Sequence, residues 1–280
     1  MNVQPLLAVT ALALLSVSCN SGPTPPEPGT PAFLWNASKQ TYRDGDFAKT
    51  SDNLSEILRG DNDYAARARV WQVMLTAGMA QGYSELATAY DAGAKANRAN
   101  PMPFRKQVTD LRTRGGRAAL DLTEAVHDFV AKDQSADVLL AFAFPAGSVA
   151  KPGSYNKVYA GMTLQESEAQ GLQSEMAQHG AVLALCELAG SPGDSAKVLD
   201  KFKAGEVKLP RATYLYGAAK LLYDNSELFG SNKLDQPQRL TVMCEEALKA
   251  LKGVPENKDT KDLTAKIQAA LKKIKKGPGV

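Results

Sequence analysis

Apolar residues recur every three or four positions along most of this chain, and this spacing constrains its fold more than any other feature. Residues spaced in this way lie on one face of an α-helix, so each stretch predicts a helix with one buried side. Glycine and proline fall mostly between the periodic stretches. We therefore predict an all-α fold from about residue 32 to residue 275. Four stretches show the period most clearly: Tyr64, Ala68, Trp71 and Leu75; Leu172, Met176, His179, Leu183 and Cys186; Leu240, Cys244, Ala247 and Leu251; and Leu263, Ile267, Leu271 and Ile274.

Two segments interrupt the helical pattern. The apolar run Val138–Phe144 is compatible with a helix or a short strand, and we predict a helix because no second strand is evident to pair with it. Residues 145–162 contain two prolines and three glycines and are predicted to form the longest irregular loop. A third feature is the pair Gly115–Gly116, which five basic residues surround; it predicts a solvated break between helices, with an anion-binding turn as the alternative.

The N-terminal segment differs from the rest of the chain. The apolar run Leu6–Leu15 is too short to span a bilayer, which takes about 20 residues, and small residues lead from it to Cys19. Residues 1–19 resemble a bacterial lipoprotein signal peptide. The resemblance implies removal of residues 1–18, lipid on Cys19, and a proline-rich tether over residues 19–31. An ordinary secretory signal is the alternative. Because residue 20 is Asn20 and not aspartate, the resemblance implies an outer-membrane protein that faces the periplasm.

A helical-repeat pattern begins after the tether. Residues 35–62 resemble one tetratricopeptide repeat, and residues 71–94 resemble a second, degenerate copy with its turn at Gly82–Tyr83. The resemblance covers residues 32–97 and implies a degenerate α-solenoid, in which stacked helix pairs bury one another's apolar faces. The residues that carry it are Trp35, Ala37, Tyr42, Gly45, Asp46, Phe47, Leu54, Ile57, Leu58, Asp61 and Asn62 in the first copy, and Trp71, Leu75, Gly82, Tyr83, Leu86, Ala87, Tyr90 and Ala94 in the second.

The resemblance to tetratricopeptide repeats implies that eight residues of this chain occupy the positions that face the groove in that family. The first copy supplies five of them and the second supplies three, and their mixed cationic and aromatic character suits an extended peptide or a carboxylate. The alternative for the two aromatic residues is ordinary packing between helices. The eight positions are Trp35, Asn36, Lys39, Tyr42, Arg43, Arg69, Gln72 and Thr76.

Residues suited to catalysis or metal binding are few. Two histidines are present: His179 lies on an apolar helical face, and His127 has no second histidine four positions away. No nucleotide-binding, dinucleotide-binding or nucleophile motif occurs, so we predict no catalytic residue, no metal and no cofactor. The net charge is only +3, and positive and negative side chains are interspersed along the chain, which argues against nucleic acid as a partner.

The remaining predictions concern the C-terminal half. Cys186 and Cys244 occupy apolar helical positions in a chain expected to be exported, so a disulfide and two buried thiols both stay open. The lysine-rich end is predicted to be a capping helix with a charged outer face. We divide the chain into the signal peptide (1–18), the lipidated cysteine and linker (19–31), a repeat-like helical region (32–131) and a further helical region (132–280).

These features favour a cell-envelope lipoprotein that acts as an adaptor or scaffold for a protein or peptide partner. The first alternative is a small-ligand carrier, because an exported lipoprotein of this size also looks like the periplasmic T-component of tripartite transporters. That alternative predicts an aromatic pocket between helices. An enzyme is the least favoured class. The aromatic residues concerned are Phe142, Phe144, Tyr155, Tyr159, Tyr214 and Tyr223.

Overall fold

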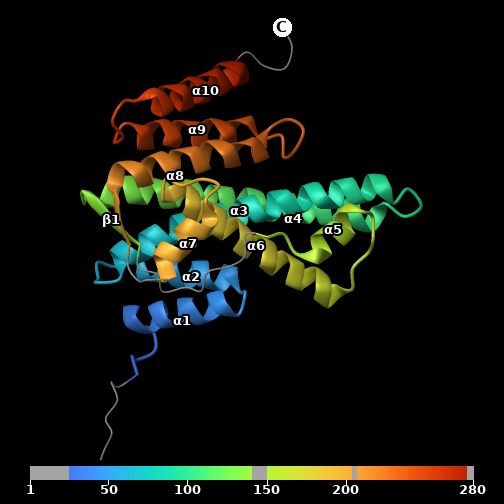
Figure 1. Ribbon diagram of the computed structural model, residues 1–280, viewed down its shortest axis with the longest axis horizontal. Helices are drawn as coiled ribbons and strands as arrows, with labels where there is room; N and C mark the ends of the chain where they lie inside the picture. Colours follow the sequence, from blue (N-terminus) through green and yellow to red (C-terminus); the bar gives the residue numbers. More distant parts are fainter. Residues whose placement is uncertain (1–24, 141–149, 204–206, 276–280) are drawn as a thin grey trace, which may run out of the picture.

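The computed structural model describes residues 25–140, 150–203 and 207–275, and they are predominantly helical, as predicted (Figure 1). The signal peptide and Cys19 lie outside the described residues. The helices are α1 (Pro31–Arg43), α2 (Phe47–Ile57), α3 (Ala65–Ala96), α4 (Met102–Lys132), α5 (Gly153–Tyr159), α6 (Glu166–Leu188), α7 (Ser195–Lys203), α8 (Arg211–Ser226), η1 (Glu227–Phe229), α9 (Pro237–Leu251) and α10 (Lys258–Lys275), and the strands are β1 (Asp137–Leu140) and β2 (Val207–Pro210).

Helices α1 and α2 form the helix hairpin that the first repeat predicts. Thr30 caps α1, because its hydroxyl accepts from the amide of Phe33 at 3.3 Å. Gly45 adopts φ +76° in the turn, a left-handed conformation that favours glycine. Asp46 then caps α2 by accepting from the amide of Lys49 at 3.0 Å. The Gly-Asp turn of the sequence motif therefore has a direct structural role.

The second predicted helix pair does not form, because α3 is a single helix of 32 residues. Gly82, predicted to lie in a turn, lies inside this helix where α6 crosses it. A Cβ atom on Gly180 would overlap the carbonyl oxygen of Gly78, and one on Gly82 would overlap that of Met176. The glycines permit close helix contact, which explains why a turn was wrongly predicted here.

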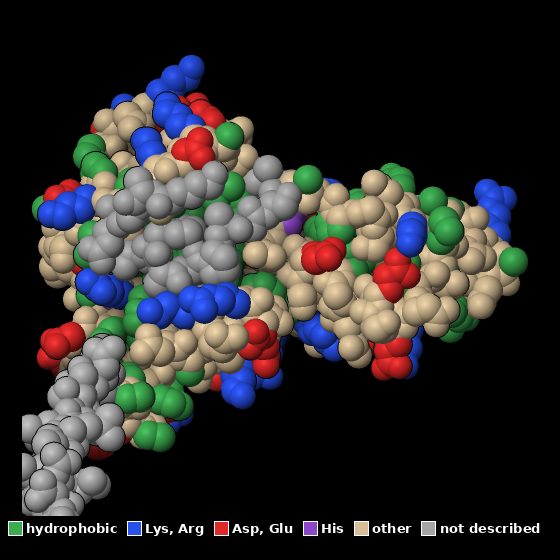
Figure 2. Space-filling model, turned by 60° about the horizontal axis from the view of Figure 1, so that its bottom comes forward, with side chains coloured by type: hydrophobic (Ala, Val, Ile, Leu, Met, Phe, Trp, Pro, Cys, Tyr) green, Lys and Arg blue, Asp and Glu red, His purple; other side chains and the backbone are tan. Residues whose placement is uncertain are grey.

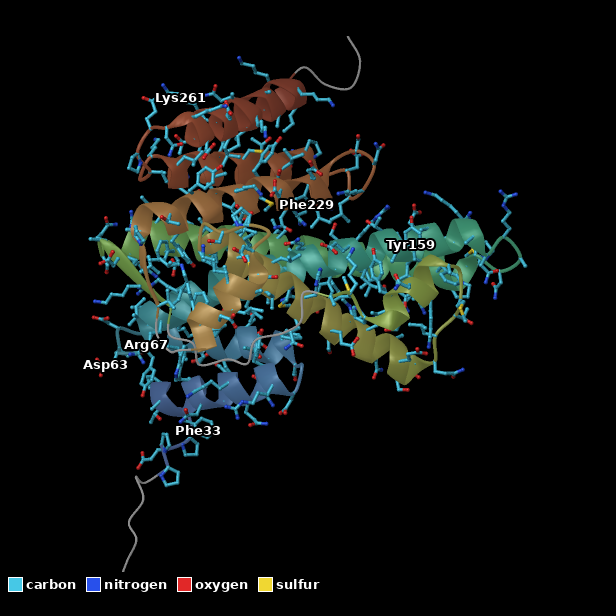
Figure 3. All side chains as sticks on the ribbon, in the orientation of Figure 1. Phe33, Asp63, Arg67, Tyr159, Phe229 and Lys261 are labelled. Atoms are coloured by element: carbon cyan, nitrogen blue, oxygen red, sulfur yellow. The ribbon has the colours of Figure 1, made fainter. Side chains whose placement is uncertain are left out.

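Helix α4 is likewise unbroken through Gly115 and Gly116, so neither a helix break nor an anion-binding turn forms there. Both glycines are buried. A Cβ atom on Gly116 would come within 2.5 Å of Leu234 Cδ1 and 3.5 Å of Phe229 Cε1. The connection between α8 and α9, where Figure 3 labels Phe229, therefore packs directly on this part of α4.

The long helices extend from a layered body into a protruding arm (Figure 1; Figure 2). In the body, α1 and α2 lie on one side of α3, and α8, α9 and α10 lie on the other. The arm contains the C-terminal half of α3, the N-terminal half of α4, helix α5 and the start of α6. Its own core is separate from that of the body and consists of Leu86, Ala87, Ala89, Tyr90, Phe104, Val108, Leu111, Tyr155, Val158, Leu172 and Met176.

The prediction of a helix at Val138–Phe144 is wrong for its first residues. Strand β1 pairs antiparallel with β2, with Val138 opposite Leu209 and Leu140 opposite Val207. The partner strand comes some seventy residues later, which is why local sequence does not reveal it. Phe142 and Phe144 lie outside the described residues. The predicted loop 145–162 is also not wholly irregular, because α5 occupies residues 153–159.

The C-terminal helix packs as predicted. Leu263 and Ile267 are buried, and the lysines of α10 with described side chains are exposed to solvent. Figure 3 labels Phe33 on α1 and Lys261 on α10 at opposite ends of the layered body. Among the described helices, none combines the length and the apolar character that crossing a bilayer demands.

Candidate binding groove

The eight residues predicted to line one groove occupy different surfaces and the core. Trp35 and Tyr42 are each 4% exposed and pack inward, as their alternative interpretation predicts. The Tyr42 ring lies 5.2 Å from that of Phe47 and 6.3 Å from that of Trp71, with edge-to-face geometry in both pairs. These two aromatic residues therefore stabilise the α1–α2 hairpin on α3.

The other six residues divide between solvent and interior. Asn36 and Arg43 are exposed on α1, where Lys39 is half-buried. Thr76 is buried and its hydroxyl donates to the carbonyl oxygen of Gln72 at 2.7 Å. Arg69 is half-buried, and its Nε atom is fully buried without a hydrogen-bond partner. Of the eight predicted residues, only Gln72 lines a polar cavity that lies between α2, α4 and α9.

That cavity is an open groove of about 730 Å³, which we call the α2–α4–α9 groove. Helices α2, α4 and α9 supply most of its lining, and Gln72 of α3 completes it. Helix α2 buries Phe47, Leu54 and Ile57 and leaves its serines free to face the groove. A groove of this volume is within the range that holds small ligands or a few side chains. Its lining is Ser51, Asp52, Ser55, Leu58, Arg59, Gln72, Arg117, Asp121, Thr123, Glu124, Ala125, His127, Asp128, Val242 and Glu246.

Gln72 connects α3 to α2 at the groove. Its residue is 6% exposed, and its amide nitrogen donates to Ser51 Oγ at 2.8 Å and to Ser55 Oγ at 3.4 Å. Its amide oxygen is buried and has no hydrogen-bond partner. A buried acceptor without a donor costs free energy, so this amide oxygen reduces the stability of the fold.

Carboxylates dominate the electrostatics of the groove. Its lining includes five carboxylates against two guanidinium groups and one imidazole. Burial raises the pKa of the Asp121 carboxyl; the Arg117 guanidinium lowers it, and the carboxylates of Glu124 and Asp52 raise it. The groove therefore carries negative charge that is incompletely neutralised.

Helix α9 contributes a buried carboxylate, that of Glu246, to the groove lining. Glu246 is 8% exposed and accepts a hydrogen bond from Lys249 Nζ at 2.6 Å. This hydrogen bond raises the pKa of the Lys249 ammonium. The exposed His127 ring places Nδ1 3.3 Å from the other Glu246 oxygen. Glu246 thus has partners on both of its oxygens, unlike the Gln72 amide.

A second cavity of about 310 Å³ lies between α3, α6 and α8. In the wall of this cavity, Lys220 forms ion pairs with Glu187 at 3.0 Å and with Asp224 at 2.9 Å, so these three charges are paired. Cys186 also lines this cavity, and burial raises the pKa of its thiol to about 11. A thiol of that kind stays protonated and unreactive at neutral pH.

Cys186 and Cys244 are both buried free thiols, so the structure contains no disulfide between them. His179 is also buried, as expected for a histidine on an apolar face, although its Nε2 lies 3.7 Å from a carboxylate oxygen of Glu85. Its Nδ1 has no hydrogen-bond partner. Within the described ranges, no group of three or more histidine, cysteine, aspartate or glutamate side chains is placed to hold a metal ion.

Four of the aromatic residues predicted to line a ligand pocket lie within the described part of the chain, and these four do not gather around one cavity. Tyr214 is fully buried in the body core, where its hydroxyl donates to the carbonyl oxygen of Val70 at 3.1 Å. Tyr155 belongs to the arm core, whereas Tyr159 is 55% exposed on the arm. Tyr223 is half-buried against the body core.

Most residues of the α2–α4–α9 groove were absent from the predicted site. A signal for the α4 wall is present in the sequence, because Arg117, Asp121, Glu124 and Asp128 follow one another at helical intervals of four and three. Such a stripe is normally a solvated helix face. Nothing local marks Glu246, which reaches the groove only because α9 packs on α4.

Comparison with protein-family models, curated proteins and solved structures gives no match for this chain.

Proposed function

We propose that this chain is a lipid-anchored protein of the bacterial cell envelope that binds a protein partner and catalyses no reaction. The lipoprotein-like segment at residues 1–19 supports the location, with the outer membrane and its periplasmic face as the proposed site. The observation that carries the binding role is the open α2–α4–α9 groove, whose lining comes from helices in separate parts of the chain. An open polar groove of this kind suits a side chain or loop of a partner.

Intact-mass measurement of the protein extracted from membranes tests the anchor. We expect the mature chain to begin at Cys19 and to carry acyl chains, and Cys19→Ser to move the protein to the soluble fraction. A mature protein that begins at another residue and carries no lipid would refute the proposed location.

Cross-linking in the native membrane, followed by mass spectrometry, tests the adaptor role. Ser55 lines the groove, so Ser55→Trp places a large ring in it and is expected to abolish capture of the partner. The control is Lys39→Glu combined with Arg43→Glu, which changes the charge of α1 outside the groove lining. Circular dichroism establishes that each variant is folded.

The two variants also separate the two candidate binding surfaces. Loss of the partner with Ser55→Trp alone supports the groove, whereas loss with the α1 variant alone assigns binding to α1. Retention of every partner by both variants refutes the adaptor role. A small molecule that copurifies with the wild-type protein would instead support the carrier alternative.

A further inference from the structure

The arm exposes large apolar side chains near its free end. Among the described residues, five large apolar side chains are exposed, and three of them belong to the arm: Met102 (64%), Tyr159 (55%) and Met162 (55%). Met102 begins α4, whereas Tyr159, which Figure 3 labels, ends α5 and Met162 follows it. Folding therefore leaves these three side chains in water, although their burial would be favourable.

Two connections meet at this end of the arm, the turn between α3 and α4 and the segment between α5 and α6 (Figure 1). Asn97 of the turn donates from Nδ2 to the carbonyl oxygen of Gly161 at 3.1 Å. A Cβ atom on Gly161 would come within 3.1 Å of Ala96 Cβ, so the connections are in close contact. We call residues 95–106 and 159–163 together the arm tip.

The arm tip is also cationic. Residues 92–109 contain four basic side chains and no acidic one. Lys95 is neutralised by Asp91, with which it pairs at 2.6 Å. The other three are exposed, and within the described ranges none of them forms an ion pair: Arg98, Arg105 and Lys106.

Few acidic side chains oppose these cations. Residues 158–165 contain no charged side chain. The next acidic residues along the chain are Glu166 and Glu168 at the start of α6, and Glu168 pairs with Lys157 at 2.8 Å. The arm tip therefore combines exposed apolar groups with a surplus of positive charge.

Two of the unpaired cations line a hollow of about 400 Å³ in the arm tip. Arg98 comes from the α3–α4 turn and Arg105 from the first turn of α4. A guanidinium group presents paired N–H donors that match the oxygens of a phosphate. The whole lining is Asp91, Ala94, Lys95, Arg98, Pro101 and Arg105.

An anionic phospholipid surface matches both properties of the arm tip. Its headgroups present phosphates to basic side chains, and the boundary below them accepts apolar side chains. The position of the tether agrees with this occupant. Residues 19–30 in an extended conformation reach about 37 Å, and α3, with 32 residues, is about 48 Å long. The arm projects to one side of the α1 end of the body, where the tether enters (Figure 1).

We propose that the arm tip binds the surface of an anionic bilayer. Arg98, Arg105 and Lys106 contact the headgroup phosphates, and the three exposed apolar side chains enter the boundary below them. This proposal rests on the proposed function in one respect, since the lipid on Cys19 brings the tip to the membrane. The tip then provides a second contact, which fixes the orientation of the anchored protein.

An environment-sensitive dye on the arm tip tests the proposal. Ala160→Cys provides an exposed thiol between Tyr159 and Met162 in the full chain that also carries Cys19→Ser, and the buried Cys186 and Cys244 do not compete for the dye. We expect its emission to shift to shorter wavelength with vesicles of phosphatidylcholine and phosphatidylglycerol, and to stay unchanged with phosphatidylcholine alone.

A second labelling position separates contact by the tip from attachment through the N-terminal segment. The same dye on Gln238→Cys, an exposed position of α9 in the body, is expected to show no shift. If Ala160→Cys fails to fold, Asn100→Cys, exposed in the α3–α4 turn, carries the dye instead.

Charge variants test the role of the arginines. Arg98→Gln combined with Arg105→Gln is expected to raise the lipid concentration for a half-maximal shift about tenfold or more. Lys272→Gln combined with Lys273→Gln is the matched control, because it removes two exposed charges from α10 outside the arm. Weakening by the α10 variant alone would assign lipid binding to α10 and overturn the proposal.

Other outcomes are equally decisive. No shift with either vesicle overturns the proposal, and so does an equal shift with both, because charge would then play no part. If the vesicles give no shift and the arginine variant instead loses a captured protein partner, the arm tip is a protein interface and the proposal is wrong.

The failure of this proposal is distinguishable from the failure of the proposed function. The dye is read without an acylated Cys19, so a mature protein that carries no lipid refutes the anchor and leaves binding by the arm tip intact. A lipidated Cys19 with no response of the dye refutes only the second contact. The adaptor role is tested separately by Ser55→Trp.

Discussion

At the residue scale, two residues that line the groove, Gln72 and Asp121, have features that cost the fold free energy. Gln72 buries an amide oxygen that has no hydrogen-bond partner, and burial raises the pKa of Asp121 although the Arg117 guanidinium lowers it. Residues optimised only for stability would remove both penalties. The sequence did not single out Asp121, because an acidic residue in a helical stripe looks like ordinary solvated surface until α2 is placed opposite it.

Replacing Asp121 by asparagine is expected to stabilise the fold at pH 7, by up to about 1 kcal/mol. Its folded-state pKa is raised, so the folded protein bears the cost of the ionised carboxylate at every pH above that value. As pH falls through the raised pKa towards the unfolded-state pKa, the folded state takes up the proton first and the cost disappears. The advantage of Asp121→Asn should therefore shrink on acidification.

Urea denaturation at pH 7 and at pH 4 measures this difference. Asp110→Asn, exposed on the same helix, is expected to leave stability unchanged at both values. A loss of stability in Asp121→Asn at pH 7 would contradict the inference that burial of the ionised Asp121 carboxylate destabilises the fold.

The two buried cysteines support a second prediction at this scale. Burial raises the pKa of both thiols, that of Cys186 to about 11, so few thiolates exist at pH 8. We expect neither to react with a thiol reagent in the native protein and both to react in urea, as read by mass spectrometry. Failure to label them in urea without reductant would reveal the disulfide that the structure lacks.

At the element scale, the helical period predicted the presence of most helices, but glycine misled the placement of their ends. Gly45 adopts a left-handed conformation in a turn, whereas Gly82 and Gly116 lie within long helices at tight contacts. Local sequence cannot separate these roles, because the absence of a Cβ atom serves both. Only the position of a second element, α6 or the α8–α9 connection, distinguishes them.

The crossing of α3 and α6 predicts opposite effects for two glycines of the same helix. Gly180→Ala places a methyl group against the backbone of Gly78 and Gly82, and is expected to destabilise the protein by about 2 kcal/mol or more. Gly171→Ala on the same helix meets no atom within 4 Å and is expected to stabilise it by about 0.5–1 kcal/mol through helix propensity. Urea denaturation of both variants tests the crossing, and equal effects would contradict it.

At the scale of the whole molecule, the body and the arm divide the structure into two cores joined by continuous helices. The groove lies in the body and uses α2, α4 and α9, which are far apart in sequence. Likewise, β1 and β2 pair across some seventy residues. Periodicity within a helix contains no information about such pairings, which is why the sequence predicted the helical class and the first hairpin but neither the groove nor the sheet.

The arm is expected to open more readily than the body, because its core contains far fewer buried residues than the body core. Helix α4 provides an internal comparison, since residues 104–111 belong to the arm and residues 118–126 to the body. Hydrogen exchange should be about tenfold faster in the arm segment, after correction for intrinsic rates, which corresponds to roughly 1.4 kcal/mol in opening free energy. Equal protection along α4 would show that the two cores open as one unit. Faster exchange confined to the arm would mean that the arm can open while the α2–α4–α9 groove stays intact, because the groove residues all lie on the body side of the α3–α6 crossing.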